Sequence, residues 1–228
     1  MIKQISGSQM ISEALHEEGV EIVFGYPGGA ALNIYDETYK QTYFKHVLVR
    51  HEQAAVHAAD GYARVSGKVG VAFVTSGPGF TNAVTGLATA YSDSIPVVLI
   101  SGQVPTFMIG TDAFQEIDAV GISRPCVKHN FLVNSVEELP RIIKEAFYIA
   151  RSGRPGPVHI DIPKNVTSRL GDFVYPKEIS IPSYKPTYKG NSKQIKKAAA
   201  AINEAKRPLL YIGGGAVASN ASDIIRKF

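Results

Sequence analysis

Short apolar runs alternate with amphipathic segments along the first 163 residues of the chain. Apolar runs occupy residues 20–26, 46–50, 69–75, 96–102 and 156–163, and helical patterns follow at 8–19, 31–39, 52–66, 81–91 and 135–152. Ser8 is the expected N-cap of the first helix, and Ser135 with Glu138 forms a predicted capping box for the last. Continuous apolar strands between helices are typical of a parallel sheet covered on both faces. We therefore predict a doubly wound α/β domain over residues 1–165.

The pattern changes after this domain. Residues 166–191 contain Pro176, Pro182 and Pro186 with little periodicity, which indicates an extended linker. A second α/β unit is expected from residue 192, with a helix over 192–205, the strand "PLLYI" and the turn "GGGAVAS". The helical pattern is still running at Phe228. We expect residues 192–228 to be the start of a truncated domain in a fragment of a longer protein.

Composition narrows the class of protein. Hydrophobic residues make up 45% and charged residues 19% of the chain, with a net charge of +4. Four lysines between residues 189 and 197 form the densest basic cluster, which favours a solvated helix face over nucleic-acid binding. Residues 69–111 carry a single charge, but Gly77 and Pro78 break the run, so no membrane segment is predicted. One cysteine, Cys126, excludes an internal disulfide and suits a reducing, cytoplasmic location.

Glycine-rich turns follow several predicted strands: "GYPGG", "SGPG", "SGQVP" and "IGGGAVAS". Ligands of open α/β sheets bind at the carboxyl ends of strands, where these turns lie. The last turn also matches the dinucleotide fingerprint G-x-G-x-x-A. Tight strand-to-helix turns require glycine in any case, so no single turn establishes a ligand site.

Polar residues in the same regions are harder to explain. In "HEQAAVH" the histidines are six residues apart, which does not match a zinc-binding helix, and "VTSGPG" lacks the first glycine of a hydrolase nucleophile elbow. His129 and His159 lie in apolar runs and are interpreted as structural. Glu52 remains, at the tip of an apparently buried strand, although burying a carboxylate is costly. The polar cluster "TDAFQE" at residues 111–116 also lacks an explanation from composition.

The motifs "FGYPGGA", "RHEQAA", "GYAR", "TSGPGFTN", "GQVP", "IGTDAFQE", "SGRPGPV" and "DIPK" occur in order along the chain. In this respect the chain resembles the N-terminal part of the large, catalytic subunit of acetolactate synthase, also called acetohydroxyacid synthase. "HEQ" and "SGPG" are shared by many thiamine-diphosphate enzymes, whereas "GQVPT" with "IGTDAFQE" is specific to this one. The resemblance implies a pyrimidine-binding domain at residues 1–165 and a central FAD-binding-type domain that begins at 192. It also implies that the C-terminal domain, which holds Mg²⁺ and the diphosphate, is absent from this chain.

The resemblance also implies a reaction. Glu52 would hydrogen-bond N1′ of thiamine diphosphate and promote loss of the C2 proton, which forms the reactive ylide. The ylide attacks pyruvate, carbon dioxide leaves, and the hydroxyethyl carbanion adds to a second 2-keto acid. The products serve synthesis of valine, isoleucine and leucine. Without the third domain, the chain alone is expected to be inactive, with no metal ligand of its own.

Residue roles carried over from the family fall into three groups. The catalytic residues would be Glu52, Gly29 and Gln115. Thiamine diphosphate would also contact Tyr26, Pro27, Pro78 and Asn82, and FAD would contact Arg154, Gly213, Gly214 and Gly215. The substrate channel would be lined by Val104, Pro105, Ala113, Phe114 and Lys164. Simpler interpretations exist, in which Arg154 satisfies backbone carbonyls and Phe114 belongs to the core.

The expected partners are a second copy of the chain, as a dimer or tetramer with the active site between subunits, and a regulatory small subunit. The uncharged helix at 81–91 predicts burial on every side, so its outer face should meet another chain. Alternative functions are another thiamine-diphosphate carboligase, a pyruvate oxidase, or a dimerisation module without cofactor. The FAD-containing biosynthetic type is favoured over the FAD-free catabolic type by "GRPGP" and "GGGA".

Overall fold

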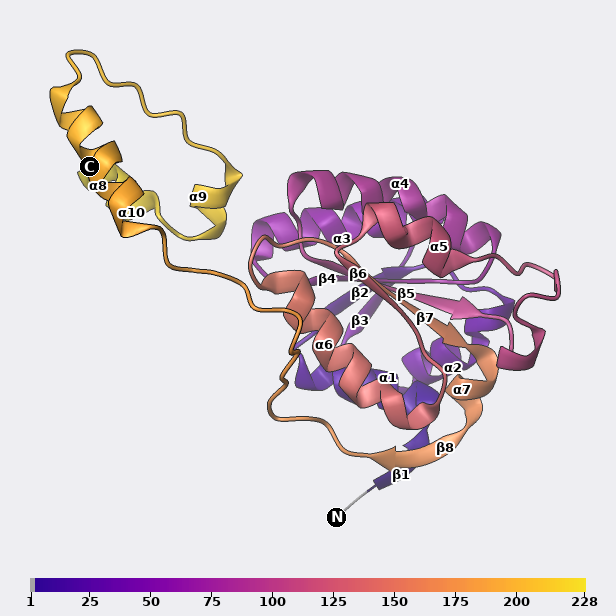
Figure 1. The fold of residues 1–228 in the computed structure, drawn as a ribbon. Helices are drawn as coiled ribbons and strands as arrows, with labels where there is room; N and C mark the ends of the chain where they lie inside the picture. The colour runs from indigo at the N-terminus through magenta and orange to yellow at the C-terminus, as the bar shows by residue number, and fades with distance from the viewer. Residues whose placement is uncertain (1–2) are drawn as a thin grey trace. The chain divides into compact units, whose positions relative to one another are not determined.

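The computed structural model describes residues 3–228, and the chain divides into two compact units, one ending at Ile181 and the other spanning Pro182–Phe228. The first unit contains a six-stranded sheet in the order β3-β2-β4-β5-β7-β6, in which every neighbouring pair is parallel (Figure 1). Its strands are β2 (Ile22–Gly25), β3 (Lys45–Leu48), β4 (Gly70–Val74), β5 (Val97–Gln103), β6 (His129–Leu132) and β7 (Val158–Pro163).

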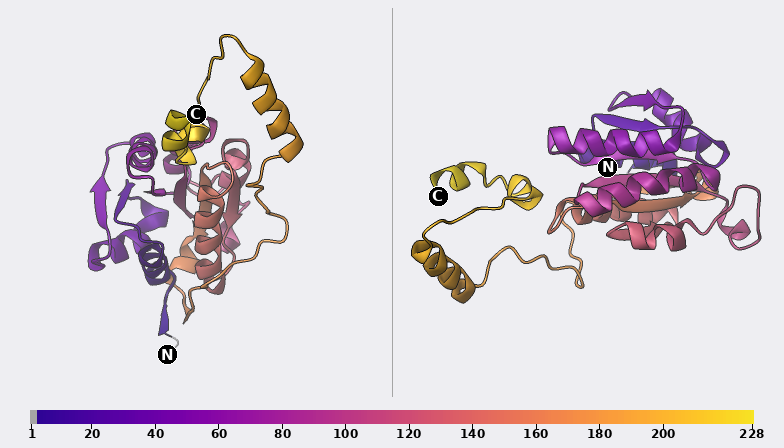
Figure 2. Two further views of the ribbon diagram at one scale, coloured as in Figure 1. Left: turned by 90° about the vertical axis from the view of Figure 1, so that its left-hand side faces the viewer. Right: turned by 90° about the horizontal axis from the view of Figure 1, so that it is seen from above.

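Helices cover both faces of this sheet (Figures 1 and 2). One layer contains α3 (Glu52–Ser66), α4 (Pro78–Asp93) and the short α5 (Ala119–Ser123). The other layer contains α1 (Gly7–Glu17), α2 (Leu32–Lys40) and α6 (Leu139–Arg151). Every residue of β4, β5 and β7 is buried, which explains their continuous apolar runs. The predicted doubly wound α/β fold is confirmed.

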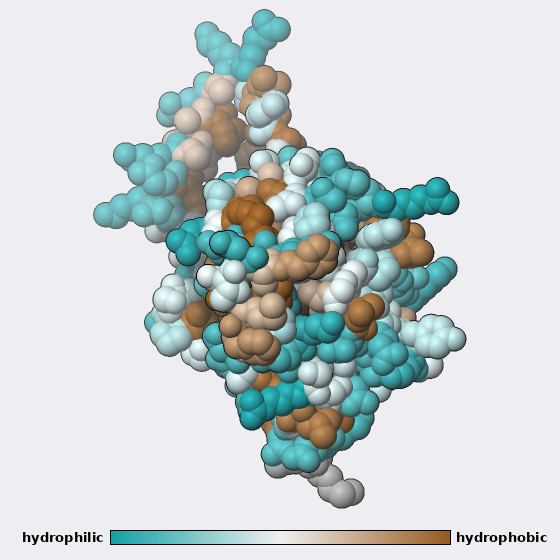
Figure 3. Space-filling model, turned by 90° about the vertical axis from the view of Figure 1, so that its right-hand side faces the viewer, coloured by the Kyte–Doolittle hydropathy of each residue, from teal (hydrophilic) through white to brown (hydrophobic). Residues whose placement is uncertain are grey.

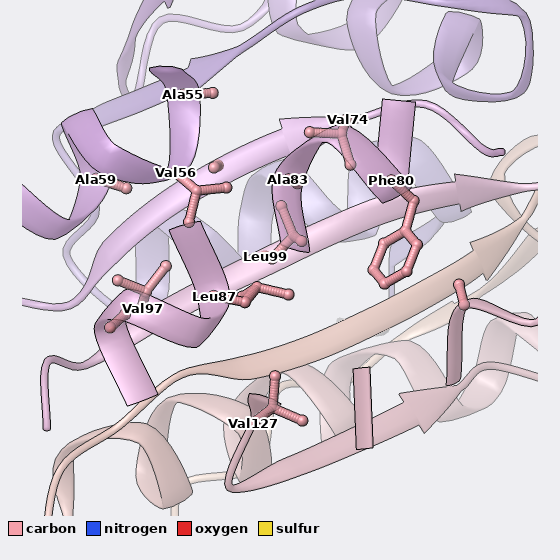
Figure 4. Packing of buried hydrophobic residues seen from close by; sticks show 13 residues of the cluster. Ala55, Val56, Ala59, Val74, Phe80, Ala83, Leu87, Val97, Leu99 and Val127 are labelled. Carbon is pink, nitrogen blue, oxygen red and sulfur yellow. The ribbon is translucent and has the colours of Figure 1, made fainter. Parts of the chain in front are cut away.

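The core beneath α3 and α4 is built from small and branched side chains (Figure 4). Val56 and Ala59 of α3 and Phe80, Ala83 and Leu87 of α4 are fully buried. They pack against sheet residues that include Val74, Val97 and Leu99. The alanines allow the two helices to lie close to the sheet and to each other.

Several local predictions need correction. Residues 166–173, expected to belong to the linker, contain most of α7 (Lys164–Ser168) and all of β8 (Leu170–Phe173). Strand β8 pairs antiparallel with β1 (Lys3–Ser6) in a separate two-stranded sheet. Strands this short lack a readable periodicity, and each depends on a partner more than 160 positions away along the chain. The extended segment therefore starts only after Phe173.

The helix caps also differ from those expected. Ser6, not Ser8, caps α1, and it forms a reciprocal capping box with Gln9. The predicted box at Ser135 is not formed, because Glu138 accepts a hydrogen bond from the Asn134 amide at 3.1 Å. A 3₁₀ turn, Val136–Glu138, precedes α6 instead. Further 3₁₀ turns lie at Gly29–Ala31, Thr106–Met108 and Arg124–Cys126.

The second unit contains α8 (Ser192–Glu204), α9 (Gly214–Ala218) and α10 (Ser222–Lys227). Asn191 caps α8 by accepting from the Lys193 and Gln194 amides at 3.0 and 3.2 Å. The strand predicted at "PLLYI" is not formed, and Leu209 is 89% exposed. A strand requires a partner for its backbone groups, and none pairs with this segment within residues 3–228. Over the same residues, no helix is long and apolar enough to cross a membrane.

Candidate active site

A crevice is expected where the order of strands reverses. From β2 the chain passes to β3 on one side, and it then returns across β2 to β4 on the other. Helices α2 and α3 consequently lie on opposite faces, and the carboxyl ends of β2 and β4 form a topological switch point. Turns after β2, β3 and β4 converge there, and these turns carry Gly29, Glu52 and Pro78.

Glu52 is the first residue of α3, and only 7% of its surface is exposed. The helix N-terminus favours a negative charge at this position. Asn82 of α4 donates from Nδ2 to Glu52 Oε2 at 3.0 Å. Within residues 3–228, the other carboxylate oxygen, Oε1, has no hydrogen-bond donor. Glu52 is therefore held by one oxygen, and the second is left for other contacts.

Tyr35 of α2 lies near this carboxylate. Burial raises the pKa of the Tyr35 hydroxyl, and the charge of Glu52 raises it further. The hydroxyl donates to the Phe73 carbonyl of β4 at 3.2 Å. Tyr35 therefore stays neutral, and its hydrogen bond to Phe73 ties α2 to β4 near the switch point.

Thr75 joins the turns that follow β2 and β4. Its Oγ1 accepts from the Ala30 amide at 3.3 Å. A Cβ at Gly28 would lie 2.4 Å from Thr75 Cγ2, so only glycine permits this approach. A Cβ at Gly79 would lie 2.6 Å from the same methyl group and 3.3 Å from Glu52 Oε1. The glycines of "GYPGG" and "SGPG" thus bring the two turns together beside Glu52. Thr75 was not predicted from the sequence as a member of this site.

The loop between β5 and α5 closes against the same turn. Gly77 has φ of +55°, and a Cβ there would lie 2.4 Å from the Gln115 carbonyl oxygen. This contact places the backbone of Gln115 against the residue that caps α4, five positions before Asn82. The structure thus brings Gln115, Pro78, Asn82 and Glu52 together around one turn.

The other expected site residues lie around this edge of the first unit. Tyr26 is 40% exposed, and Pro27 and Gly29 are also exposed; no heavy atom lies within 4 Å of the place where a Gly29 Cβ would be. Figure 3 faces this edge and shows separate hydrophobic patches among hydrophilic side chains.

The predicted channel residues lie beyond the ends of β5 and β7. Val104 is buried, Pro105 and Ala113 are half-buried, and Lys164 opens α7. Asn165 of α7 accepts from the Thr106 amide at 3.0 Å and donates to its hydroxyl at 3.0 Å, which joins α7 to the loop. Phe114 is 87% exposed, so its interpretation as a core residue is wrong.

Within the first unit, Arg154 lies away from this site. Arg154 precedes β7 and donates to Ser94 Oγ at 2.7 Å and to the Ser92 carbonyl at 3.3 Å, at the amino edge of the sheet. These contacts match the simpler interpretation, in which Arg154 satisfies groups at the end of α4. Gly213 precedes α9 in the second unit, and the strand expected before it is not formed.

A largely buried polar cluster lies beside the loop, on β5, β6, β7 and α5. Its members are Ser101, Gln103, Ser123, Asn130, His159 and Asp161. Asp161 accepts from Ser101 Oγ and from Gln103 Nε2, the latter at 2.9 Å. His159 is fully buried and stacks on Phe80, which agrees with its interpretation as structural. A cavity of about 250 Å³, lined in part by Ile109, Ile117, Leu132 and Asp161, opens next to this cluster.

The arrangement defines a class of protein: a doubly wound domain with a buried glutamate at the switch point, one carboxylate oxygen of which is held by Asn82. The family described as thiamine pyrophosphate enzyme, N-terminal TPP binding domain, matches residues 5–122. The chain belongs to this family.

Similar proteins are large subunits of acetolactate synthase. That of Buchnera aphidicola subsp. Schizaphis graminum is 55% identical over 226 residues, covering 98% of this chain and 40% of that protein. The isozyme 3 large subunit of Escherichia coli K12 is 53% identical over 99% of this chain and 40% of that protein. A probable large subunit of Methanocaldococcus jannaschii is 54% identical over 96% of this chain and 37% of that protein. The chain thus spans about 40% of the length of these curated relatives.

The residues fit the aminopyrimidine end of thiamine diphosphate. A ring nitrogen can share a proton with Glu52 Oε1, since that oxygen has no donor within residues 3–228. The glycines at 28, 29 and 79 keep side chains away from the same space. Over the described part of the chain, no group of three or more His, Cys, Asp or Glu residues could hold a metal ion.

Proposed function

We propose that the protein containing this chain is a thiamine-diphosphate-dependent enzyme that joins two 2-keto acids, as an acetolactate synthase does. Pyruvate would lose carbon dioxide, and its remaining two-carbon unit would be transferred to a second 2-keto acid. The observation that carries the proposal is Glu52, a nearly buried carboxylate at the switch point, with Asn82 on one oxygen. Identity above 50% to acetolactate synthase large subunits over nearly the whole chain supports the substrate class.

When bound, thiamine diphosphate supplies a carbon nucleophile, because its C2 proton can be removed by its own amino group. The protein's part is to hold a proton at the right atom. Glu52 Oε1 would hold the proton shared with the pyrimidine nitrogen, while Asn82 fixes the carboxylate through Oε2. Tyr26, Pro27 and Pro78, on the turns after β2 and β4, would contact the cofactor. Gln115, whose backbone lies on Gly77, would contribute a polar group from the loop.

Replacement of Glu52 by Gln in the full-length protein tests this function. The amide keeps the size of the side chain but cannot exchange a proton with the ring. We expect turnover to fall by about 10²- to 10⁴-fold. Exchange of the thiamine C2 proton, followed by NMR, should slow in parallel.

The contrasting hypothesis is that Glu52 only stabilises the start of α3. The substitution would then cost at most about 1 kcal/mol of stability and leave turnover nearly intact. Near-normal formation of acetolactate by Glu52→Gln would refute the catalytic role. Product analysis of the unmodified protein separates the alternatives, since a pyruvate oxidase does not join two 2-keto acids into one product.

We also propose that the active enzyme contains FAD and Mg²⁺. The G-x-G-x-x-A match at Gly213, Gly215 and Ala218 supports FAD. To contact FAD, Arg154 would have to break its hydrogen bonds to Ser92 and Ser94 and donate to the cofactor instead.

A second copy of the chain is the proposed partner. The outer faces of α3 and α4 support this, because they carry small uncharged residues such as Ala54, Ala58, Thr85 and Ala88. Within a single chain α4 buries only its inner face, and Thr85 is exposed. The burial on every side that the sequence predicts for this helix therefore requires a second copy of the chain.

A further inference from the structure

The loop from Val104 to Asp118 carries several residues of the proposed site, and it needs an internal support. It protrudes beyond the carboxyl ends of the strands, between β5 and α5 (Figure 1). Its only regular element is the turn Thr106–Met108. Asp112 and Gln115 adopt φ of 55° and 59°, a left-handed conformation that is unfavourable for non-glycine residues. Such strain persists only where the surroundings enforce it.

The support is the carboxylate of Glu116. Its Oε1 accepts from the Gly110 amide, and its Oε2 accepts from the Ala113 amide at 3.0 Å. The Glu116 amide donates back to the Ala113 carbonyl at 2.9 Å. The hydrogen bonds that the carboxylate accepts lower the pKa of Glu116, with smaller contributions from the amides of Thr111 and Asp112. One side chain thus gathers the backbone from Gly110 to Ala113 around itself.

The folded loop packs against the candidate site. Gln115, directly before Glu116, has its carbonyl against Gly77, in a space that a Cβ would fill. Gly77 caps α4, the helix whose Asn82 holds Glu52. At the far end of the loop, Gln103 donates to the Ile117 carbonyl at 3.0 Å. The position of Gln115 relative to Glu52 therefore depends on how the segment 110–116 is folded.

We propose that Glu116 is a positioning residue for the condensation step: its carboxylate folds the segment 110–116 so that Gln115 and Phe114 face the substrates. The proposal rests on the proposed function for the identity of the substrates that the loop faces. Its structural part, the dependence of the loop on Glu116, is independent of that function. The step affected involves the substrates, whereas the side chain that donates to Glu52 is Asn82 of α4, outside this loop.

The chemistry of the side chain makes the proposal specific. A carboxylate offers acceptors on both oxygens and can receive several amide donors at once. In Glu116→Gln one acceptor becomes an NH₂ group that faces a backbone N–H, so at least one hydrogen bond is lost. Asp112→Asn is the matched control, because it removes the same charge in the same loop from a side chain that is exposed.

Kinetics of the full-length holoenzyme give the first test. Misplacement of positioned groups by about 1 Å can cost on the order of 10²-fold in rate. We expect Glu116→Gln to lower kcat for condensation of pyruvate by roughly 10- to 100-fold. Exchange of the thiamine C2 proton should remain at the unmodified rate. Asp112→Asn should retain both. Equal loss of C2 exchange and condensation in Glu116→Gln, or normal condensation, would overturn the proposal.

Amide hydrogen exchange of the full-length protein, without added cofactor or substrate, gives the second test. The Gly110 and Ala113 amides should be protected in the unmodified protein and in Asp112→Asn, and should lose that protection in Glu116→Gln and Glu116→Ala. Retained protection in both Glu116 variants would overturn the proposal even if their activity fell. If Glu52→Gln proves fully active, the proposed function fails, and the exchange result still decides the role of Glu116 in the loop.

Discussion

At the scale of single residues, the first unit buries two titratable groups, two positions apart in sequence, whose pKa values burial shifts in opposite directions. Burial raises the pKa of Asp161 to about 7, an effect that hydrogen bonds from Ser101 and Gln103 oppose. Burial lowers the pKa of His159 to about 3. Ser101 contacts both side chains, so they belong to one network. Each group is neutral in the folded protein over much of the acidic range, as a low-dielectric core requires.

This pair predicts a compensated pH dependence of folding stability. Between pH 3.8 and 6.5, folded Asp161 retains a proton that the unfolded chain releases, so its contribution falls as the pH rises. In the same interval unfolded His159 binds a proton that the folded protein excludes, so its contribution falls as the pH drops. The two slopes are opposite and cancel.

Variants should reveal each slope separately. Relative to the unmodified protein, stability of Asp161→Asn should increase with pH across this interval, and stability of His159→Gln should decrease. For each variant, the number of protons taken up or released on unfolding should differ by nearly one from that of the unmodified protein. This corresponds to about a tenfold change in the unfolding equilibrium constant per pH unit. Urea denaturation at several pH values measures this. Parallel pH profiles for all the proteins would contradict the assignment.

At the scale of elements, the turn between β4 and α4 depends on close backbone approach. Gly77 combines a φ of +55° and a ψ of −115°, outside the left-handed helical region, with direct contact to the loop. Gly67, which ends α3, is in the left-handed helical region with φ of +71°, and no heavy atom lies within 4 Å of its missing Cβ. Gly67 therefore carries conformational strain alone, whereas Gly77 carries conformational strain and steric exclusion.

We expect Gly77→Ala to destabilise the chain more than Gly67→Ala. Gly67→Ala should bear the left-handed penalty of about 1–2 kcal/mol. Gly77→Ala should bear at least as much, because its φ and ψ lie outside the regions allowed to L-residues. Gly77→Ala adds a clash with the Gln115 carbonyl, which should cost roughly 1–3 kcal/mol more or displace the loop. Denaturant unfolding of both variants gives the difference. Equal destabilisation would show that the loop does not press on this turn.

At the scale of the whole molecule, the layer formed by α3 and α4 has an unusual outer surface for a globular domain. Its exposed and half-buried positions include Ala54, Ala58, Gly61, Thr85 and Ala88, which would let other helices approach closely. Glu52 and Asn82 lie near the starts of these helices, so a partner on this face would adjoin the site. The proposed homodimer uses this surface.

Light scattering of the full-length protein at micromolar concentration tests the dimer. The unmodified protein should have at least twice the chain mass. Thr85→Arg should shift it towards the monomer, because a long charged side chain would enter the contact. Tyr39→Arg, at a 91% exposed position of α2 in the opposite layer, should leave the mass unchanged. A monomeric unmodified protein would contradict the proposal.

Most of the fold was predictable from local pattern. The helix expected at 52–66 is α3, Glu52–Ser66, because an acidic residue opens it and Gly67 ends it with a left-handed cap. The buried strands were recognisable because burial on both faces demands apolar residues at every position. Glu52 was recognisable as a candidate site residue for the converse reason, because it is a carboxylate at a position where an apolar residue was expected.

What the sequence by itself determined is therefore the set of major strands and helices of the first unit, and the location of the glycine-rich turns after its strands. These depend on periodicity and on residues within a few positions of each other. Only the tertiary structure decided which distant groups meet: Asn82 with Glu52, Thr75 with Gly28, and Gln115 with Gly77. It also decided the pairing of β1 with β8 and the absence of a strand at "PLLYI". Such contacts join residues far apart in the chain, and their free energy comes from burial and hydrogen bonding that no local pattern records.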